Sequence, residues 1–322
     1  MRYMTSSERR LMLLRRMAIA CAVLVLVITS LSAFMRLTRT GLGCQPWPQC
    51  YGQEPLAREH GGAVAVDPVI ALARIAHRIV AVSALLLVIA MLLVALAQHP
   101  VLQRQGRMAL GLLALALFLA VLGRWTADAR APAVTLGNLL GGMGMFALSW
   151  RMALTTARAD APASGAARPR LSWAWFCFAL VLLEIALGGL VNAAHAGLSC
   201  PRLSVCDLAE GSWQAFNPWR EPRPDPAHPD NPAGALLHLA HRLGGLVLEA
   251  ALLPLGATAW RRGRPVAATL VLVLLALQAG LGAGLVLGAL PLALALGHNL
   301  ASALLLAVVL NLTDERRGRV PA

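Results

Sequence analysis

Eight long apolar windows decide what this 322-residue chain can fold into. They lie near residues 17–35, 68–97, 107–124, 132–153, 172–194, 232–259, 265–290 and 292–312. A helix needs about 20 predominantly apolar residues to cross the hydrocarbon core of a bilayer. With 58% apolar residues and a mean hydropathy of +0.67, the chain is too apolar for a soluble globule. The sequence therefore predicts an all-α integral membrane protein with eight transmembrane helices.

The arginines indicate which side of the membrane each link between helices faces. Lysine is absent, and the N-terminus, the even-numbered links and the C-terminus carry 17 arginines, against 8 in the odd-numbered links. Because basic residues stay on the cytoplasmic side, we expect both termini in the cytoplasm. We interpret the net charge of +13 as topology and exclude nucleic acid as a partner. The first window has no evident signal-peptide cleavage site, so it is expected to remain as a span.

A polar linker divides the chain at its midpoint. Residues 155–171 are rich in alanine, proline and arginine, a composition typical of a flexible cytoplasmic segment. Four helices precede it in residues 1–154, and four follow it in residues 172–322. Both halves then have the same orientation. We expect two four-helix bundles related by a parallel repeat, with the axis along the membrane normal.

A ten-residue stretch occurs once in each half. It reads ALARIAHRIV in the first half and ALLHLAHRLG in the second, so His77-Arg78 falls on His241-Arg242 at an offset of 164. Asp67-Pro68 and Asn231-Pro232 precede the two copies, and each pair predicts a helix N-cap followed by proline at the first helical position. The histidine lies nine residues after either proline, about 13 Å along the helix axis. Each half should carry an ionisable ring deep into an apolar helix.

His241 and His298 form the strongest candidate ligand pair. They lie nine and seven residues after Pro232 and Pro291, so both rings should sit at a similar depth near the outer face. A polar ring in a spanning helix usually faces the protein interior, and two imidazoles across a bundle can hold a haem iron. The alternative is a pair of histidines that hydrogen-bond between helices. His238 shares the helix face of His241 and competes as a ligand, but only His241 has a histidine counterpart in the first half.

The first half offers iron only one evident histidine. The counterparts of the ligand pair are His77 and Asn138, and asparagine is a poor haem ligand. His77 is compatible with ligation and with a structural role. Arg78 and Arg242 directly follow the repeated histidines, and each can pair with a haem propionate or pack at the membrane interface. The candidate catalytic residues are therefore His77, Asn138 and Arg78, and Arg242 joins the cofactor site.

Two close cysteine pairs lie in the long outer links, which face an oxidising compartment. Both pairs have the spacing C-x5-C: Cys44 with Cys50, and Cys200 with Cys206. We expect one disulfide in each link in preference to free or metal-bound thiols, because the C-x2-C spacing of a zinc site is absent. The other two cysteines, Cys21 and Cys177, lie within helices and are expected to be buried small apolar residues.

Together these motifs resemble the haem A synthases of cytochrome oxidase assembly. The resemblance covers nearly the whole chain: TRTGLGCQPWPQC in the first outer link, HR on the second and sixth helices, GHN on the eighth, and a cysteine pair in each long outer link. It implies oxidation of the C8 methyl group of haem o to the formyl group of haem a. It also implies a haem b cofactor ligated by His241 and His298, and a substrate haem o ligated by His77.

Two positions depart from the pattern of this family. The family places a histidine on the fourth helix, where this chain has Asn138, and a glutamate three residues before the second-helix histidine, where this chain has Arg74. Arg74 cannot act as a carboxylate base. Glu184 and Glu249 also lie within spans, and each is a candidate for a proton path or for a hydrogen-bonded structural carboxyl.

The pattern also allows functions other than synthesis of haem a. A haem b-binding assembly or electron-transfer protein without turnover fits the departures in the first half, and a transporter fits a parallel repeat with inward-facing polar residues. A haem farnesyltransferase is disfavoured, because no aspartate-rich prenyl-diphosphate motif is visible. The candidate partners are haem o and the synthase that supplies it, membrane lipid, a quinone or other electron carrier, and a second copy of the chain. The expected location is the inner, cytoplasmic membrane of a bacterium.

Overall fold

The computed structural model describes residues 5–42, 44, 47–51, 68–97, 99–126, 131–156, 172–223, 225 and 227–313. Asp67, expected to cap the second helix, and residues 157–171 of the expected linker lie outside these ranges. Thr155 and Thr156 are helical, so the linker starts later than the composition predicts.

Eight long helices dominate the described residues, and each is long and apolar enough to cross a membrane. They are α1 (Ser6–Arg39), α3 (Pro68–Leu96), α4 (Gln103–Thr126), α5 (Pro132–Thr156), α6 (Ser172–Ala193), α7 (Ala235–Arg261), α8 (Pro265–Leu287) and α9 (Leu292–Leu312). Two short 3-10 helices, η1 (Trp213–Phe216) and η2 (Pro232–Gly234), lie between α6 and α7. The described ranges contain no β-strand. The prediction of an all-α membrane protein with eight spans is confirmed.

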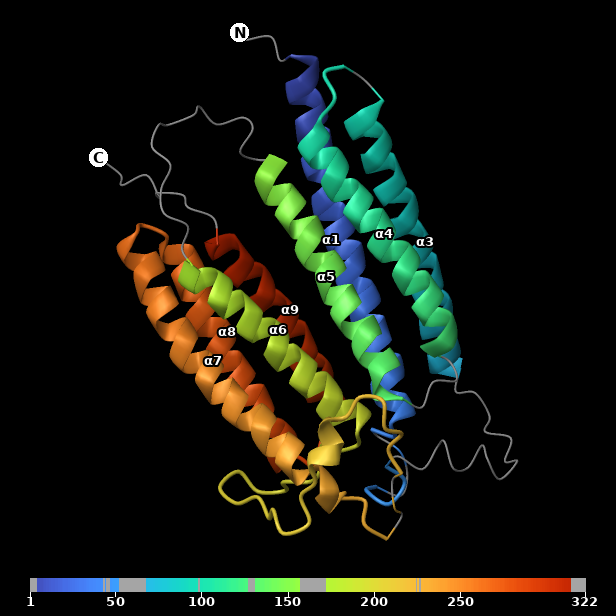
Figure 1. Cartoon of the computed structure of the whole chain (residues 1–322), viewed down its shortest axis with the longest axis vertical. Helices are drawn as coiled ribbons and strands as arrows, with labels where there is room; N and C mark the ends of the chain where they lie inside the picture. Colours follow the sequence, from blue (N-terminus) through green and yellow to red (C-terminus); the bar gives the residue numbers. More distant parts are fainter. Residues whose placement is uncertain are drawn as a thin grey trace.

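The helices pack as two groups of four. Within the first group, α1 and α4 each pack against both α3 and α5, so α3 and α5 lie on a diagonal. Within the second group, α6 and α8 each pack against both α7 and α9, which lie on the other diagonal. The groups meet where α5 contacts α6 and α9 and where α1 contacts α9. In Figure 1, α1 begins and α9 ends at one end of the protein, and the described parts of the two long outer links gather at the other.

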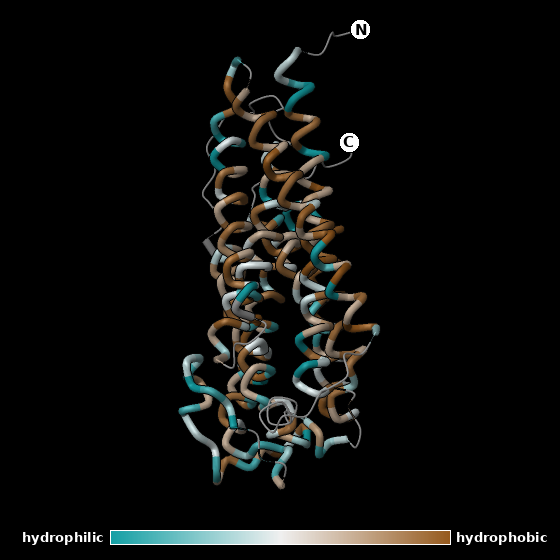
Figure 2. The backbone as a smooth tube through the Cα atoms, turned by 90° about the vertical axis from the view of Figure 1, so that its right-hand side faces the viewer, coloured by the Kyte–Doolittle hydropathy of each residue, from teal (hydrophilic) through white to brown (hydrophobic). Residues whose placement is uncertain are grey.

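The outer faces of the helices are apolar, as lipid contact requires. Large side chains such as Leu72, Leu86 and Leu93 of α3 are more than half exposed along one face. Figure 2 shows apolar colours along the helices and polar colours gathered over the links at one end. The exposed apolar surface is thus a belt suited to lipid, with a polar cap outside it.

The first span runs past its expected end at residue 35. The helix continues to Arg39 and stops where Gly41 takes a positive φ of 93°, a conformation that favours glycine. Arg36 is therefore helical, and its Nη2 donates to Oδ1 of Asn299 on α9 at 3.5 Å. A span ending at residue 35 would place Arg36 in the outer link, but the residue is part of α1 and joins the two helix groups.

The expected side-chain capping hydrogen bond of Asn231 is not formed. Asn231 precedes Pro232, as predicted, but it takes a left-handed conformation with φ 44° and its side chain makes no capping hydrogen bond. Its Nδ2 instead donates to the carbonyl oxygen of Ala194 at 2.9 Å. The side chain ties the start of η2 to the end of α6, and this long-range bond replaces the local one.

Candidate functional site

His241 of α7 and His298 of α9 face each other inside the second helix group. Their ring centroids are 6.4 Å apart and their planes are nearly perpendicular, at 85°. A metal–imidazole bond is about 2 Å long, so two rings that bind one iron axially have centroids roughly 6 Å apart. The separation of the two rings therefore fits a haem iron between them.

Glycines leave space beside both rings. A Cβ on Gly188 of α6 would lie 3.0 Å from Cε1 of His241, and one on Gly282 of α8 would lie 3.7 Å from Cε1 of His298. The missing side chains of these two glycines let the imidazole rings lie close to α6 and α8.

Buried polar atoms without hydrogen bonds surround the pair. Nδ1 of His298 and Oε1 of Gln278 are both buried and make no hydrogen bond, although Nε2 of Gln278 donates to Oγ of Ser302 at 2.5 Å. Such atoms are rare in folded proteins and call for an explanation. A polar or metal-containing ligand between α7, α8 and α9 would supply one.

His241 has a close acidic neighbour. Its Nδ1 lies 2.5 Å from Oε1 of Glu184 on α6, in a contact without the alignment of a directed hydrogen bond. The sequence placed Glu184 within a span but did not predict this contact. Only packing of α6 against α7 brings the two side chains together.

His238, the competing ligand, is buried, at 6% exposure, and its Nδ1 also lacks a hydrogen-bond partner. His241 is the histidine of this helix that forms the ring contact with His298. The geometry favours His241 over His238 as the partner of His298.

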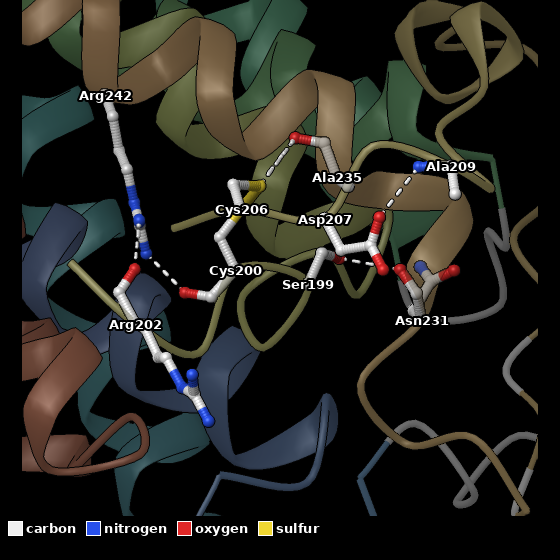
Figure 3. The surroundings of a disulfide bond; sticks show 9 residues. All are labelled: Ser199, Cys200, Arg202, Cys206, Asp207, Ala209, Asn231, Ala235 and Arg242. Carbon is white, nitrogen blue, oxygen red and sulfur yellow. Dashed lines mark hydrogen bonds between the residues drawn. A yellow bond between two sulfur atoms is a disulfide. The ribbon is translucent and has the colours of Figure 1, made fainter. Parts of the chain in front are cut away.

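Arg242 reaches into the third outer link, which joins α6 to α7 and carries Cys200 and Cys206, as Figure 3 shows. Its Nη1 donates to the carbonyl oxygen of Arg202 at 2.7 Å, and its Nη2 donates to that of Cys200. The guanidinium therefore holds the link that carries the second cysteine pair. Pairing of Arg242 with a haem propionate stays a prediction, and it would have to share or replace these bonds.

Both expected disulfides are present. Cys44 joins Cys50 with a Cα–Cα distance of 6.1 Å, and Cys200 joins Cys206 with one of 4.7 Å. The sulfur atoms of the second pair pack beside the carbonyl oxygen of Ala235, the first residue of α7 (Figure 3). The other two cysteines, Cys21 and Cys177, are free and fully buried, as predicted.

The first outer link packs against the second helix group, which the sequence did not predict. Tyr51 is 2% exposed, and its ring meets the edge of His195, with centroids 5.5 Å apart. His195 takes a positive φ of 54°, and its buried Nδ1 has no hydrogen-bond partner. Burial lowers the pKa of His195 to about 4 and raises that of Tyr51 above its usual range. The link of one half thereby covers the outer end of the other.

The candidate residues of the first half lie on the corresponding diagonal, α3 and α5. His77 of α3 is half-buried, whereas Arg74 and Arg78 are exposed on that helix. Asn138 of α5 lies with its Nδ2 3.5 Å from Oγ of Ser32 on α1. The exposure of Arg78 places it away from the buried interior of the group. The catalytic roles of His77, Asn138 and Arg78 stay predictions.

The chain is similar to a protein family and to a named protein over most of its length. A family model described as cytochrome oxidase assembly protein matches residues 15–310. A protein of Shewanella oneidensis named Heme A synthase is 31% identical over 310 residues, which cover 88% of this chain and 91% of that protein. The matched region contains six of the long helices completely and most of α1 and α9, and it includes both histidine-bearing diagonals.

Proposed function

We propose, since this chain belongs to the cytochrome oxidase assembly protein family, that it acts as a haem A synthase. The proposed substrate is haem o, and the proposed product is haem a, in which a formyl group replaces the C8 methyl group. Replacing C–H bonds of the methyl group by a carbonyl removes electrons, so the protein acts as an oxidoreductase. The relative from Shewanella oneidensis supports this activity by its name and by its coverage of both chains.

The histidine pair of the second half carries the proposal. His241 and His298 would hold haem b as its two axial ligands, and their centroid separation of 6.4 Å supports that arrangement. When bound, haem b would supply one-electron redox chemistry, and His241 and His298 would be the residues that hold it. Gly188 and Gly282 let the two rings lie close to α6 and α8, and Nδ1 of His298 is buried without a hydrogen-bond partner.

The first half is the proposed substrate site. His77 would bind haem o from α3, and Asn138 would face it from α5 with an amide in place of an imidazole. A site with one strong ligand suits a haem that must enter, be oxidised and leave, because ligation on both faces would slow exchange. The second half, with its two imidazoles, suits a haem that stays.

The family match also fits a protein that binds haem b without turnover. Arg74 stands where the resemblance would place a glutamate, so the substrate site has no carboxylate base at this position. Arg74 is also exposed on α3. An assembly or electron-transfer protein is therefore the second candidate. Such a protein would bind haem b through His241 and His298 but would not oxidise haem o.

The proposed location is the inner membrane of a bacterium, with both termini in the cytoplasm. The arginine distribution supports this orientation, and so do the two disulfides, since both lie in links expected on the oxidising side. The proposed partners are the synthase that supplies haem o, a quinone or other electron carrier, and a second copy of the chain.

Co-expression with a source of haem o, followed by pigment extraction, tests the proposal. Haem a in the extract selects the synthase, and haem b alone selects the second candidate. Purified His241→Ala and His298→Ala proteins should lose the low-spin haem b spectrum. His77→Ala should keep that spectrum and lose haem a. His238→Ala is the matched control on α7 and should keep haem b, and if it alone loses the spectrum the ligand assignment is wrong.

A further inference from the structure

Glu184 meets the candidate ligand His241 from a neighbouring helix. Oε1 of Glu184 on α6 lies 2.5 Å from Nδ1 of His241 on α7, and the two side chains are only 14% and 23% exposed. A carboxyl group at this depth in a membrane is costly unless it has a partner. The contact with an imidazole ring nitrogen gives it one.

Both helices are shaped around this contact. A Cβ on Gly244 would lie 2.3 Å from Oε2 of Glu184, so no larger residue fits there while the carboxyl group keeps its place. Gly188 follows Glu184 by one turn on α6, and its missing side chain admits the ring of His241. A glycine on each helix thus seats the partner from the other helix.

The short distance indicates where the ring carries its proton. An ionised Glu184 would repel a bare ring nitrogen at 2.5 Å, so this contact favours the tautomer of His241 with its hydrogen on Nδ1, and a rotation of the ring would align that hydrogen with the carboxylate. In a neutral imidazole the other nitrogen, Nε2, then has the free lone pair that a metal requires. Carboxylates play this part toward many metal-binding histidines, where they fix the ring and make it a stronger donor.

We infer that Glu184 is a positioning residue that fixes the orientation and tautomer of His241 for axial ligation of the haem in the second half. This inference rests on the proposed function. The added electron density on His241 stabilises the oxidised iron and lowers the reduction potential of the haem.

Among the described residues, the carboxylate contact with the repeated histidine occurs only in the second half of the chain. Cys44 and Cys200 of the two long outer links are 156 positions apart, and this offset carries Glu184 onto Ile28, while the offset of 164 carries Gly244 onto Val80. The first half therefore has neither the carboxyl group nor the glycine that makes room for it. Within the described part of the chain, His298 has no acidic contact, and Ser302 Oγ donates to its backbone carbonyl oxygen, so Glu184 supplies the carboxylate contact of this ligand pair. A haem held permanently gains from such fixation, whereas an exchanging substrate does not.

Redox titration of the purified holoprotein tests the inference, with the low-spin electron paramagnetic resonance signal recorded alongside. Glu184→Gln should keep haem b, raise its midpoint potential and shift the low-spin signal. Gly244→Ala keeps the carboxyl group but displaces it, and it should change both readouts in the same direction. Glu249→Gln is the matched control: it removes the other glutamate of the second-half spans, about 12 Å further along α7, and should leave both readouts unchanged.

Two outcomes separate this inference from the function on which it rests. If Glu184→Gln and Gly244→Ala both match the control while His241→Ala loses its haem, ligation by His241 stands and the role of Glu184 is wrong. If His241→Ala retains the unchanged low-spin signal, the proposed ligation itself is wrong and the inference fails with it.

Discussion

Arg242 should control how tightly the third outer link is held against α7. The guanidinium donates to the carbonyl oxygens of Cys200 and Arg202, on the link closed by the second disulfide (Figure 3). Arg242→Leu keeps much of the side-chain volume and removes both bonds. The disulfide remains, so the expected effect is local opening of the link and not loss of the loop.

The size of the effect follows from the two bonds. A hydrogen bond to a charged group contributes about 1.5–3 kcal/mol, but the bond to Arg202 is exposed and must be discounted for solvent screening. A total of roughly 2 kcal/mol corresponds to an increase of about 30-fold in the opening equilibrium. Arg242→Lys retains the charge but cannot span both carbonyl groups, so it should give an intermediate value.

Hydrogen–deuterium exchange with mass spectrometry measures this opening. Amides between Gly197 and Cys206 should exchange faster in Arg242→Leu, while peptides from α8 stay unchanged. The bond between Ser199 Oγ and the carbonyl oxygen of Asn231, at 2.7 Å, is the main alternative restraint on this link. Unchanged exchange in Arg242→Leu, combined with faster exchange in Ser199→Ala, would refute the reasoning.

Three further predictions concern other parts of the protein. Burial holds the pKa of His195 near 4, below the 6.5 of an unfolded histidine, so native stability should fall by about 3 kcal/mol as pH drops from 6.5 to 4. His195→Asn, which tolerates the positive φ, should flatten that part of a denaturation-against-pH curve, and an unchanged slope would contradict this. Gly234→Val should lower the free energy of unfolding by about 1–3 kcal/mol, and with it the melting temperature, because the added Cβ would lie 3.1 Å from the backbone of the outer link. Gly123→Ala is the control, since a Cβ there meets nothing within 4 Å, and it should leave the melting temperature unchanged. Asn138→His should add a second low-spin haem that disappears again with His77→Ala, and an unaltered haem content would count against the proposed substrate site.

Features that depend on a short separation in sequence or on position along one helix were predicted well. The cysteine pairs are six positions apart, and loops that short bring their own ends together, so both disulfides followed from spacing and compartment. The pairing of His241 with His298 followed from depth, since each lies a similar distance from a proline that marks the start of a helical segment. Position along a helix axis is a property that a linear sequence does encode.

Contacts between distant segments depended on the tertiary structure. The bond from Asn231 to Ala194 replaced the expected cap, and Tyr51 packed against the half to which it does not belong. Glu184 was identified as an intramembrane carboxyl group, but its neighbour was not. Each contact depends on which helices pack together and in what rotation.

The sequence by itself determined the number of spans, their ends to within a few residues in most cases, the disulfide pairs and the positions of the histidines along their helices. Rotation of each helix about its axis was decided only in the folded protein. In α9, Leu300 and Leu304 face outward while Leu305 and Leu306 are buried. Lipid and protein core are equally apolar, so leucine suits both faces and the pattern does not distinguish them. Close packing of small residues and polar contacts such as that of Glu184 with His241 select the inner face, and these form only when the helices assemble.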